Sequence, residues 1–119
     1  DGSTTRYTFN DNGSFTATGN ITAYSDARLK KNIETVDNAL DKVQQLRGVN
    51  FDKIDDPDNL GRQLGVIAQE VEKVCPEAVM DHEDGFKSVA YGNLVGLIEA
   101  IKEQQVQINQ LKRHIGVTD

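Results

Sequence analysis

The strongest constraint on the fold is a repeat of apolar residues over residues 91–115. Its spacing alternates between three and four residues, the heptad pattern of helices that supercoil around one another. An amphipathic helix lying on its own domain is the alternative interpretation, and the pattern leaves the number of associating helices open. A polar Gln104 within the repeat would fix the register of such helices. The predicted seam comprises Leu94, Leu97, Ile101, Gln104, Ile108, Leu111 and Ile115.

The composition limits both the core and the possible partners. The chain has 119 residues, of which 37% are apolar and 6% aromatic, and its net charge is −6. A core this modest often gains stability through oligomerisation. A nucleic-acid surface needs clustered basic side chains, and no apolar run approaches the roughly 20 residues of a membrane span. We therefore predict neither nucleic acid nor a membrane among the partners.

The first part of the chain, residues 1–24, has the pattern of β-structure. Aromatic and apolar residues alternate on both sides of Asn12-Gly13, a strong hairpin signal, and continue as far as Ala23. Gly19-Asn20 is a second candidate turn. Two or three strands of this size are marginal alone, so this segment needs neighbours. Its polar start predicts that it continues a longer chain upstream.

The middle of the chain alternates between helical and strand patterns, which predicts an α+β fold of short β-hairpin elements and helices. The single cysteine, Cys75, lies on the apolar side of a helical pattern and is expected to be a buried thiol. The predicted elements are a helix over 33–47 with a cap at Thr35 or Asp37 and an end at Gly48, short strands near 49–53 and 64–66, a helix from Ile67 that Pro76 stops, and a hairpin turning at Asp84-Gly85.

A possible catalytic pair lies where the threonine-rich segment gives way to the charged one, in YSDARLKKNIE. A serine hydroxyl becomes a nucleophile when a base removes its proton, and a desolvated lysine can be that base. Ser25 and Lys30 would not face each other on a continuous helix, and a straight strand puts them on opposite faces. Either a bend or a lysine from another chain is needed. From the residues alone, a polar linker with solvated lysines remains the alternative.

Three separated motifs carry a resemblance to a known family. They are YSDARLKKNIE, GVIAQEVEKVCPEAV and VAYGNLVGLIEAIKEQQVQINQL, in this order, and they extend over about residues 24–115. Together they resemble the intramolecular chaperone auto-processing domain at the C-terminus of phage tail fibres and endosialidase tailspikes. The domain also occurs in myelin regulatory factor. The preceding FNDNGSFTATGNITAY looks like the last turn of a phage fibre stalk.

The resemblance implies an intertwined homotrimer that helps an upstream β-stalk to fold and then releases itself. The implied cut is between Tyr24 and Ser25, with Ser25 as nucleophile and Lys30 as general base. Asp26 and Leu29 fit the same motif. No metal or cofactor is implied, and each chain reacts once. The implied domains are 1–24, the end of the stalk, and 25–119, the chaperone domain, with a coiled-coil helix over 93–115.

The implied partners are two further copies of the chain and the upstream stalk, in the host cytoplasm during virion assembly. The stalk would stay in the virion tail while the chaperone domain is released. Two other functions fit the same residues: a trimerisation domain that never cuts, and a receptor-binding fibre tip that stays on the particle.

Overall fold

The computed structural model describes residues 4–116, apart from the side chain of Val95. The chain divides into two compact units. One contains the chain up to Glu34 together with Pro57–Asn59, and the other contains Thr35–Asp56 and the chain from Leu60 onward. Helices and small antiparallel strand pairs make up the fold, which confirms the α+β class. No helix among the described residues is long and apolar enough to cross a membrane.

The first unit contains one β-hairpin, as the sequence predicts. Strands β1 (Tyr7–Phe9) and β2 (Phe15–Ala17) pair antiparallel, with Tyr7 opposite Ala17. Gly13 adopts a φ of +88° in the turn, a conformation that glycine reaches without strain. The predicted continuation of strand structure to Ala23 is wrong, because residues 18–24 contain no strand. A strand persists only where another backbone takes up its hydrogen bonds.

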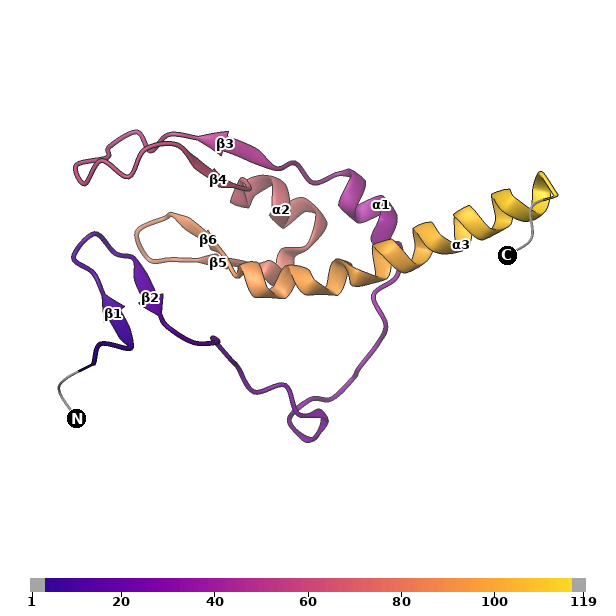
Figure 1. The fold of residues 1–119 in the computed structure, drawn as a ribbon, viewed down its shortest axis with the longest axis horizontal. Helices are drawn as coiled ribbons and strands as arrows, with labels where there is room; N and C mark the ends of the chain where they lie inside the picture. Colours follow the sequence, from indigo (N-terminus) through magenta and orange to yellow (C-terminus); the bar gives the residue numbers. More distant parts are fainter. Residues whose placement is uncertain (1–3, 117–119) are drawn as a thin grey trace. The chain divides into compact units, whose positions relative to one another are not determined.

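The second unit holds the remaining strands and all three α-helices of the described chain (Figure 1). Its two strand pairs are both antiparallel, β3 with β4 and β5 with β6. Short 3₁₀ segments connect several elements. In chain order the elements are α1 (Ala39–Gln44), β3 (Val49–Phe51), β4 (Gln63–Gly65), α2 (Ala68–Val74), η2 (Pro76–Ala78), β5 (Val79–Asp81), β6 (Lys87–Val89), η3 (Tyr91–Leu97) and α3 (Ile98–His114).

Helix α1 is much shorter than the predicted helix over 33–47, and its cap is different. Asn38 precedes it in the left-handed conformation, with φ +51°, which prevents the helix from extending upstream. Neither Thr35 nor Asp37 caps it. Instead the Glu103 carboxylate on α3 accepts hydrogen bonds from the backbone N–H groups of Ala39 and Leu40, at 2.8 and 3.2 Å. The predicted end at Gly48 is also too late, because the helix ends at Gln44.

The last helical segment differs at its start from the predicted continuous helix. Residues Tyr91–Leu97 form the 3₁₀ segment η3, and the α-helix α3 begins at Ile98. Gly92 and Gly96 lie within η3, and glycine is among the weakest α-helix formers. The tighter 3₁₀ turn therefore replaces the first turns of the predicted helix.

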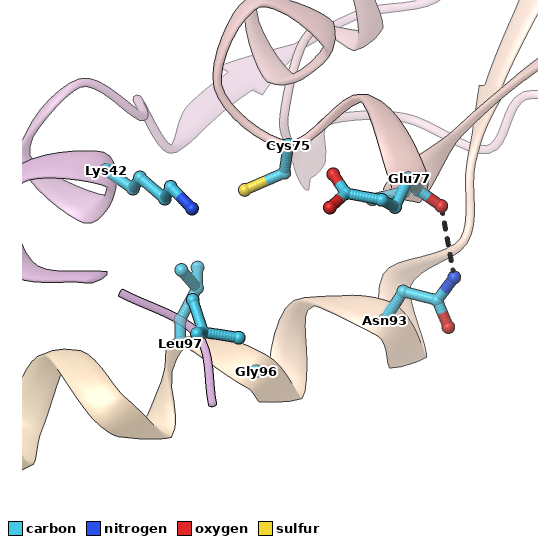
Figure 2. Close-up of a pocket in the computed structure, with 8 residues that line it drawn as sticks. Lys42, Cys75, Glu77, Asn93, Gly96 and Leu97 are labelled. Atoms are coloured by element: carbon cyan, nitrogen blue, oxygen red, sulfur yellow. Dashed lines mark hydrogen bonds between the residues drawn. The ribbon is translucent and has the colours of Figure 1, made fainter. Parts of the chain in front are cut away.

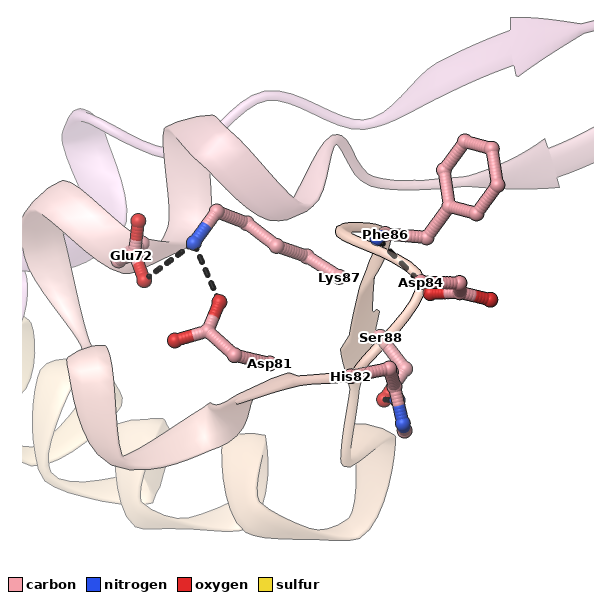
Figure 3. A network of polar contacts seen from close by, with 7 residues as sticks. All are labelled: Glu72, Asp81, His82, Asp84, Phe86, Lys87 and Ser88. Carbon is pink, nitrogen blue, oxygen red and sulfur yellow. Dashed lines mark hydrogen bonds and ion pairs between the residues drawn. The ribbon is translucent and has the colours of Figure 1, made fainter.

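The hairpin β5–β6 turns at Asp84-Gly85 as predicted, with Gly85 at a φ of +88°. An ion-pair network fastens it to α2 (Figure 3). There, Lys87 Nζ donates to a carboxylate oxygen of Asp81 and, at 3.1 Å, to Glu72 Oε2 on α2. These carboxylates, Asp81 first, raise the pKa of Lys87 above its usual range. Because the folded-state pKa of Lys87 is raised, these ion pairs stabilise the folded chain at pH values below the unfolded-state pKa of Lys87. This stabilisation is lost at strongly alkaline pH, as the pH rises through the folded-state pKa.

The buried core is small for a chain of this length. Among the described residues the buried apolar side chains are those of Ala39, Val71, Ala78 and Ala100. Three of the four are alanines, so little apolar area leaves water within a single chain. Val71 supplies the buried face of α2, as its helical pattern predicts. Many larger apolar side chains are exposed instead, and such side chains are typical of a surface that contacts another chain.

Candidate functional site

The structure brings the predicted serine and lysine into direct contact. Lys30 Nζ donates a hydrogen bond to Ser25 Oγ over 2.7 Å. Both side chains are exposed in the single chain. The contact lies within the first unit and needs no lysine from another chain. The distance is that of a nucleophile and base within hydrogen-bond reach.

A short turn makes this contact possible. Residues Ala27–Leu29 form the 3₁₀ segment η1, and the backbone is extended on both sides of it, at Asp26 and Lys30. The N–H of Leu29 donates to the carbonyl of Asp26 at 3.0 Å, and that of Lys30 to the carbonyl of Ala27 at 3.1 Å. This is the bend that the five-residue separation requires, since neither a helix nor a strand alone would close it.

Asp26 holds the turn in place from its first position. Its Oδ1 accepts from the backbone N–H of Arg28 at 2.8 Å, as an N-cap does. The Arg28 guanidinium also bonds both carboxylate oxygens, at 3.0 and 2.9 Å. The Arg28 side chain, and after it the Arg28 backbone N–H, lowers the pKa of Asp26 below its usual value. Because the folded-state pKa of Asp26 is lowered, the cap stabilises the folded chain at pH values above the unfolded-state pKa of Asp26. This stabilisation is lost as the pH falls through the folded-state pKa.

We expect Arg28→Ala to raise the pKa of Asp26 toward that of an ordinary aspartate, since the largest cause of the lowering is removed. A pH titration of the Asp26 carboxyl carbon by NMR measures this. Asp56 serves as the control: backbone N–H groups of Leu60 and Gly61 lower its pKa, and Arg28→Ala leaves both of those bonds in place. An Asp26 titration that does not move would contradict the assigned role of Arg28.

The surroundings of the serine and lysine are open to solvent. Tyr24 is 94% exposed and Leu29 is 67% exposed. With Asp26 and Arg28 they line a shallow hollow beside the Tyr24-Ser25 bond. Two large side chains beside this bond are thus exposed to solvent, and exposed side chains of this kind suit contact with another chain.

The residues of the predicted seam fall into two groups. Leu94 and Leu97, in η3, are half-buried within their own unit. The later members are exposed: Ile101 by 71%, Leu111 by 60% and Ile115 by 65%. Gln104 and Ile108 are exposed as well. The interpretation of a helix lying on its own domain therefore fits the start of the repeat, whereas the later members are exposed in the part of the chain that the structure describes.

A groove runs beside the start of this exposed face. Leu40 and Val43 of α1 line one side, and Leu97, Ala100 and Ile101 line the other. Gln104 lies on the same groove. Because α1 and α3 both contribute apolar side chains to it, a helix packed here would contact both of them at once.

The thiol of Cys75 lines a small cavity between α1, η2 and η3 (Figure 2). Cys75 is half-buried, so the expectation of a buried thiol holds only in part. The cavity measures about 100 Å³, well below the ~300–1,000 Å³ of usual ligand pockets, so we treat it as a packing gap. Asn93 closes one side by donating to the Glu77 carbonyl at 3.3 Å. Within residues 4–116 no group of three or more His, Cys, Asp or Glu side chains could hold a metal ion.

Two residues contribute to these arrangements without having been predicted from the sequence. Arg28 supports the turn through Asp26, and a basic residue two positions after an aspartate is too common a pattern to reveal this. Glu103 caps α1 from a position 64 residues further along the chain, for which no local pattern exists.

Comparison with known proteins identifies the family. Residues 25–80 match the family model described as "Chaperone of endosialidase", whose name also classes it among the peptidases. The chain is 37% identical over 119 residues to the long tail fiber protein Gp37 of Enterobacteria phage M1, covering 89% of this chain and 47% of that protein. It is 35% identical over 100 residues to Gp37 of Enterobacteria phage K3, covering 78% of this chain and 8% of that protein.

A further match, over a smaller share of the chain, lies outside the phages. An uncharacterized membrane protein of Dictyostelium discoideum is 36% identical over 83 residues, which are 57% of this chain and 5% of that protein. The chain thus spans about half or far less of the length of these relatives. The family match itself begins at Ser25 and includes Lys30. The chain belongs to the chaperone-of-endosialidase family.

Proposed function

We propose that this chain is the intramolecular chaperone of a phage tail fibre, and that it cuts itself from the fibre at the Tyr24-Ser25 bond. In this proposal residues 1–24 are the end of the fibre stalk and residues 25–119 are the chaperone. Three copies associate through the seam, bring three stalk segments into register, and are then released. The observation that carries the cleavage step is the 2.7 Å contact between Lys30 Nζ and Ser25 Oγ.

The chemistry needs the side chains of Ser25 and Lys30, the Tyr24-Ser25 peptide bond and a water molecule. Ser25 Oγ attacks the carbonyl carbon of Tyr24 while a neutral Lys30 amine takes the hydroxyl proton. The C–N bond then breaks, and Lys30 returns the proton to the departing amine of Ser25. The product is an ester between the Tyr24 carboxyl group and Ser25 Oγ. Water hydrolyses this ester, leaving Tyr24 as a free acid and restoring the serine hydroxyl.

The state of the lysine determines when the reaction starts. In the contact described above, Lys30 donates to Ser25, whereas a base must accept the serine proton. An ammonium group surrounded by water cannot accept it, and desolvation favours the neutral amine. Because both side chains are exposed in the single chain, we infer that the trimer supplies the desolvating cover. Cleavage would then follow assembly.

The exposed seam supports the assembly step. Winding three stalk chains together is slow, because the residues that contact each other in the folded stalk are far apart in sequence or belong to different chains. A helix bundle holds the chains at high local concentration while this happens. The small core and the exposed side chains of Ile101, Leu111 and Ile115 favour such a bundle over a stable monomer.

Analysis of purified fibres tests the complete proposal. We would produce the parent fibre with the wild-type chain and with Ser25→Ala, isolate the folded trimers, and measure the mass of their polypeptides. The proposed function predicts fibres that end at Tyr24 in the wild type and retain 25–119 in the variant. Wild-type fibres that keep residues 25–119 would indicate instead a trimerisation domain that never cuts or a retained receptor-binding tip.

A further inference from the structure

A single side chain ties the start of α1 to the middle of the last helix. The carboxylate of Glu103 on α3 accepts from the Ala39 N–H at 2.8 Å through Oε2 and from the Leu40 N–H at 3.2 Å through Oε1. Asn38, the residue in the cap position, makes no side-chain cap bond of its own. Glu103 is half-buried, so water competes less with these charge-assisted bonds than it would on an open surface.

Helix α1 depends on this attachment. It has six residues, whereas isolated helices below roughly 12–15 residues are marginal in water. Its first residue, Ala39, is 0% exposed, and Ala100 of α3 is 4% exposed. The two helices pack against each other, and Figure 1 shows α1 beside α3. The position of α1 is therefore set by α3.

The start of α1 is also close in sequence to the proposed catalytic lysine. Only residues 31–38 separate Lys30 from Ala39, and they contain no helix or strand. Two of them, Asn32 and Asn38, adopt left-handed backbone conformations. Fixing one end of so short a connection restricts the positions that the other end can reach.

On α3, Glu103 lies between Ile101 and Gln104 of the predicted seam. Both of those residues line the groove that Leu40 and Val43 of α1 complete. A helix packed into the groove would hold α1 and α3 together, and Glu103 joins the same two helices next to it. The seam thus lies beside the Glu103 cap, the cap holds the start of α1, and the covalent chain joins α1 to Lys30.

We propose that Glu103 is a positioning residue for cleavage. It fixes the start of α1, and because residues 31–38 join α1 to Lys30, the packing of the seam then affects the conformations open to this connection. This inference rests on the proposed self-cleavage, and it assigns Glu103 no contact with the reacting atoms. It predicts that assembly and cleavage can be separated by changing Glu103 alone.

The test compares Glu103→Ala with Glu103→Gln and with Glu99→Ala, in the full chain. Glu99 lies one turn earlier on α3 and pairs with Lys102 of the same helix, so Glu99→Ala removes the same charge without touching α1. Native mass gives the oligomeric state, and denaturing mass over time gives the cleavage rate within the oligomer. We expect Glu103→Ala to assemble and to cleave at least about tenfold more slowly. Glu103→Gln, which keeps one acceptor oxygen, should have an intermediate rate, and Glu99→Ala the wild-type rate.

Hydrogen exchange provides a readout that does not need cleavage. In chains that also carry Ser25→Ala, oligomeric Glu103→Ala should exchange faster than oligomeric Glu99→Ala over residues 26–38, and not only at Ala39 and Leu40. Unchanged exchange over 26–38 overturns the inference, as does a wild-type cleavage rate in assembled Glu103→Ala. Failure of Glu103→Ala to assemble also overturns it, because Glu103 would then act in assembly. If the wild type stays uncut while the exchange difference is present, the proposed cleavage fails and the positional link stands.

Discussion

We expect the Ser25→Ala and Lys30→Ala variants to remain whole at 119 residues under conditions in which the wild-type chain is expected to separate into 1–24 and 25–119. Ser25→Ala removes the nucleophile and leaves no route to the ester, so its cleavage should fall to background. Lys30→Ala keeps the nucleophile but loses the base, which costs about 10²–10⁴-fold in rate. Denaturing mass spectrometry of time points taken after production gives both rates.

Lys31→Ala is the matched control for the lysine variant. It removes an identical charge one residue further along the chain, whereas the structure assigns the contact with Ser25 to Lys30. We expect Lys31→Ala to cleave within about threefold of the wild type, since surface substitutions away from a site have small effects. If Lys30→Ala cleaves normally, or if Lys31→Ala stops the reaction instead, the assignment of Lys30 as the base is wrong.

The second large effect is expected from the seam. Replacing Ile101 and Ile108 together by aspartate places two charges on the face that we propose to be covered by other copies, and burying an unpaired charge costs several kcal/mol. In the single chain these side chains are 71% and 43% exposed, so the fold of the monomer should tolerate the change. We expect a monomer that does not cleave, although Ser25 and Lys30 are both intact.

The control for the seam variant adds the same charge to another part of the helix. Val106 is 54% exposed on α3 and lies outside the heptad seam, as does the exposed Gln110. Val106→Asp with Gln110→Asp should therefore assemble and cleave like the wild type. Light scattering gives the oligomeric state of each variant, and denaturing mass gives its cleavage. Efficient cleavage by monomeric Ile101→Asp with Ile108→Asp would contradict the dependence of the reaction on assembly.

The elements that could be predicted from the sequence are those set by neighbouring residues. Asn12-Gly13 and Asp84-Gly85 predicted the two hairpin turns, because their glycines reach backbone conformations that other residues avoid. The buried position of Val71 followed from helical spacing alone. In each case the determining interactions lie within a few residues along the chain.

The elements that could not be predicted depend on distant residues. The start of α1 is set by Glu103, 64 residues away, so caps sought at Thr35 or Asp37 gave the wrong boundary. The heptad over 91–115 continued into η3, where two glycines and packing within the unit give a tighter turn. Spacing alone left two possibilities for Ser25 and Lys30, a bend between them or a lysine from another chain. The bend that the structure contains depends on the cap that Asp26 provides.

The most direct test of the central claim is the intact mass, under denaturing conditions, of the freshly made 119-residue wild-type chain in its oligomeric state. We predict two species, 1–24 ending in a free Tyr24 carboxyl group and 25–119 beginning with a free Ser25 amine. A single species with the mass of the whole chain, from a sample that is oligomeric and includes the Tyr24-Ser25 bond, would contradict self-cleavage by this domain.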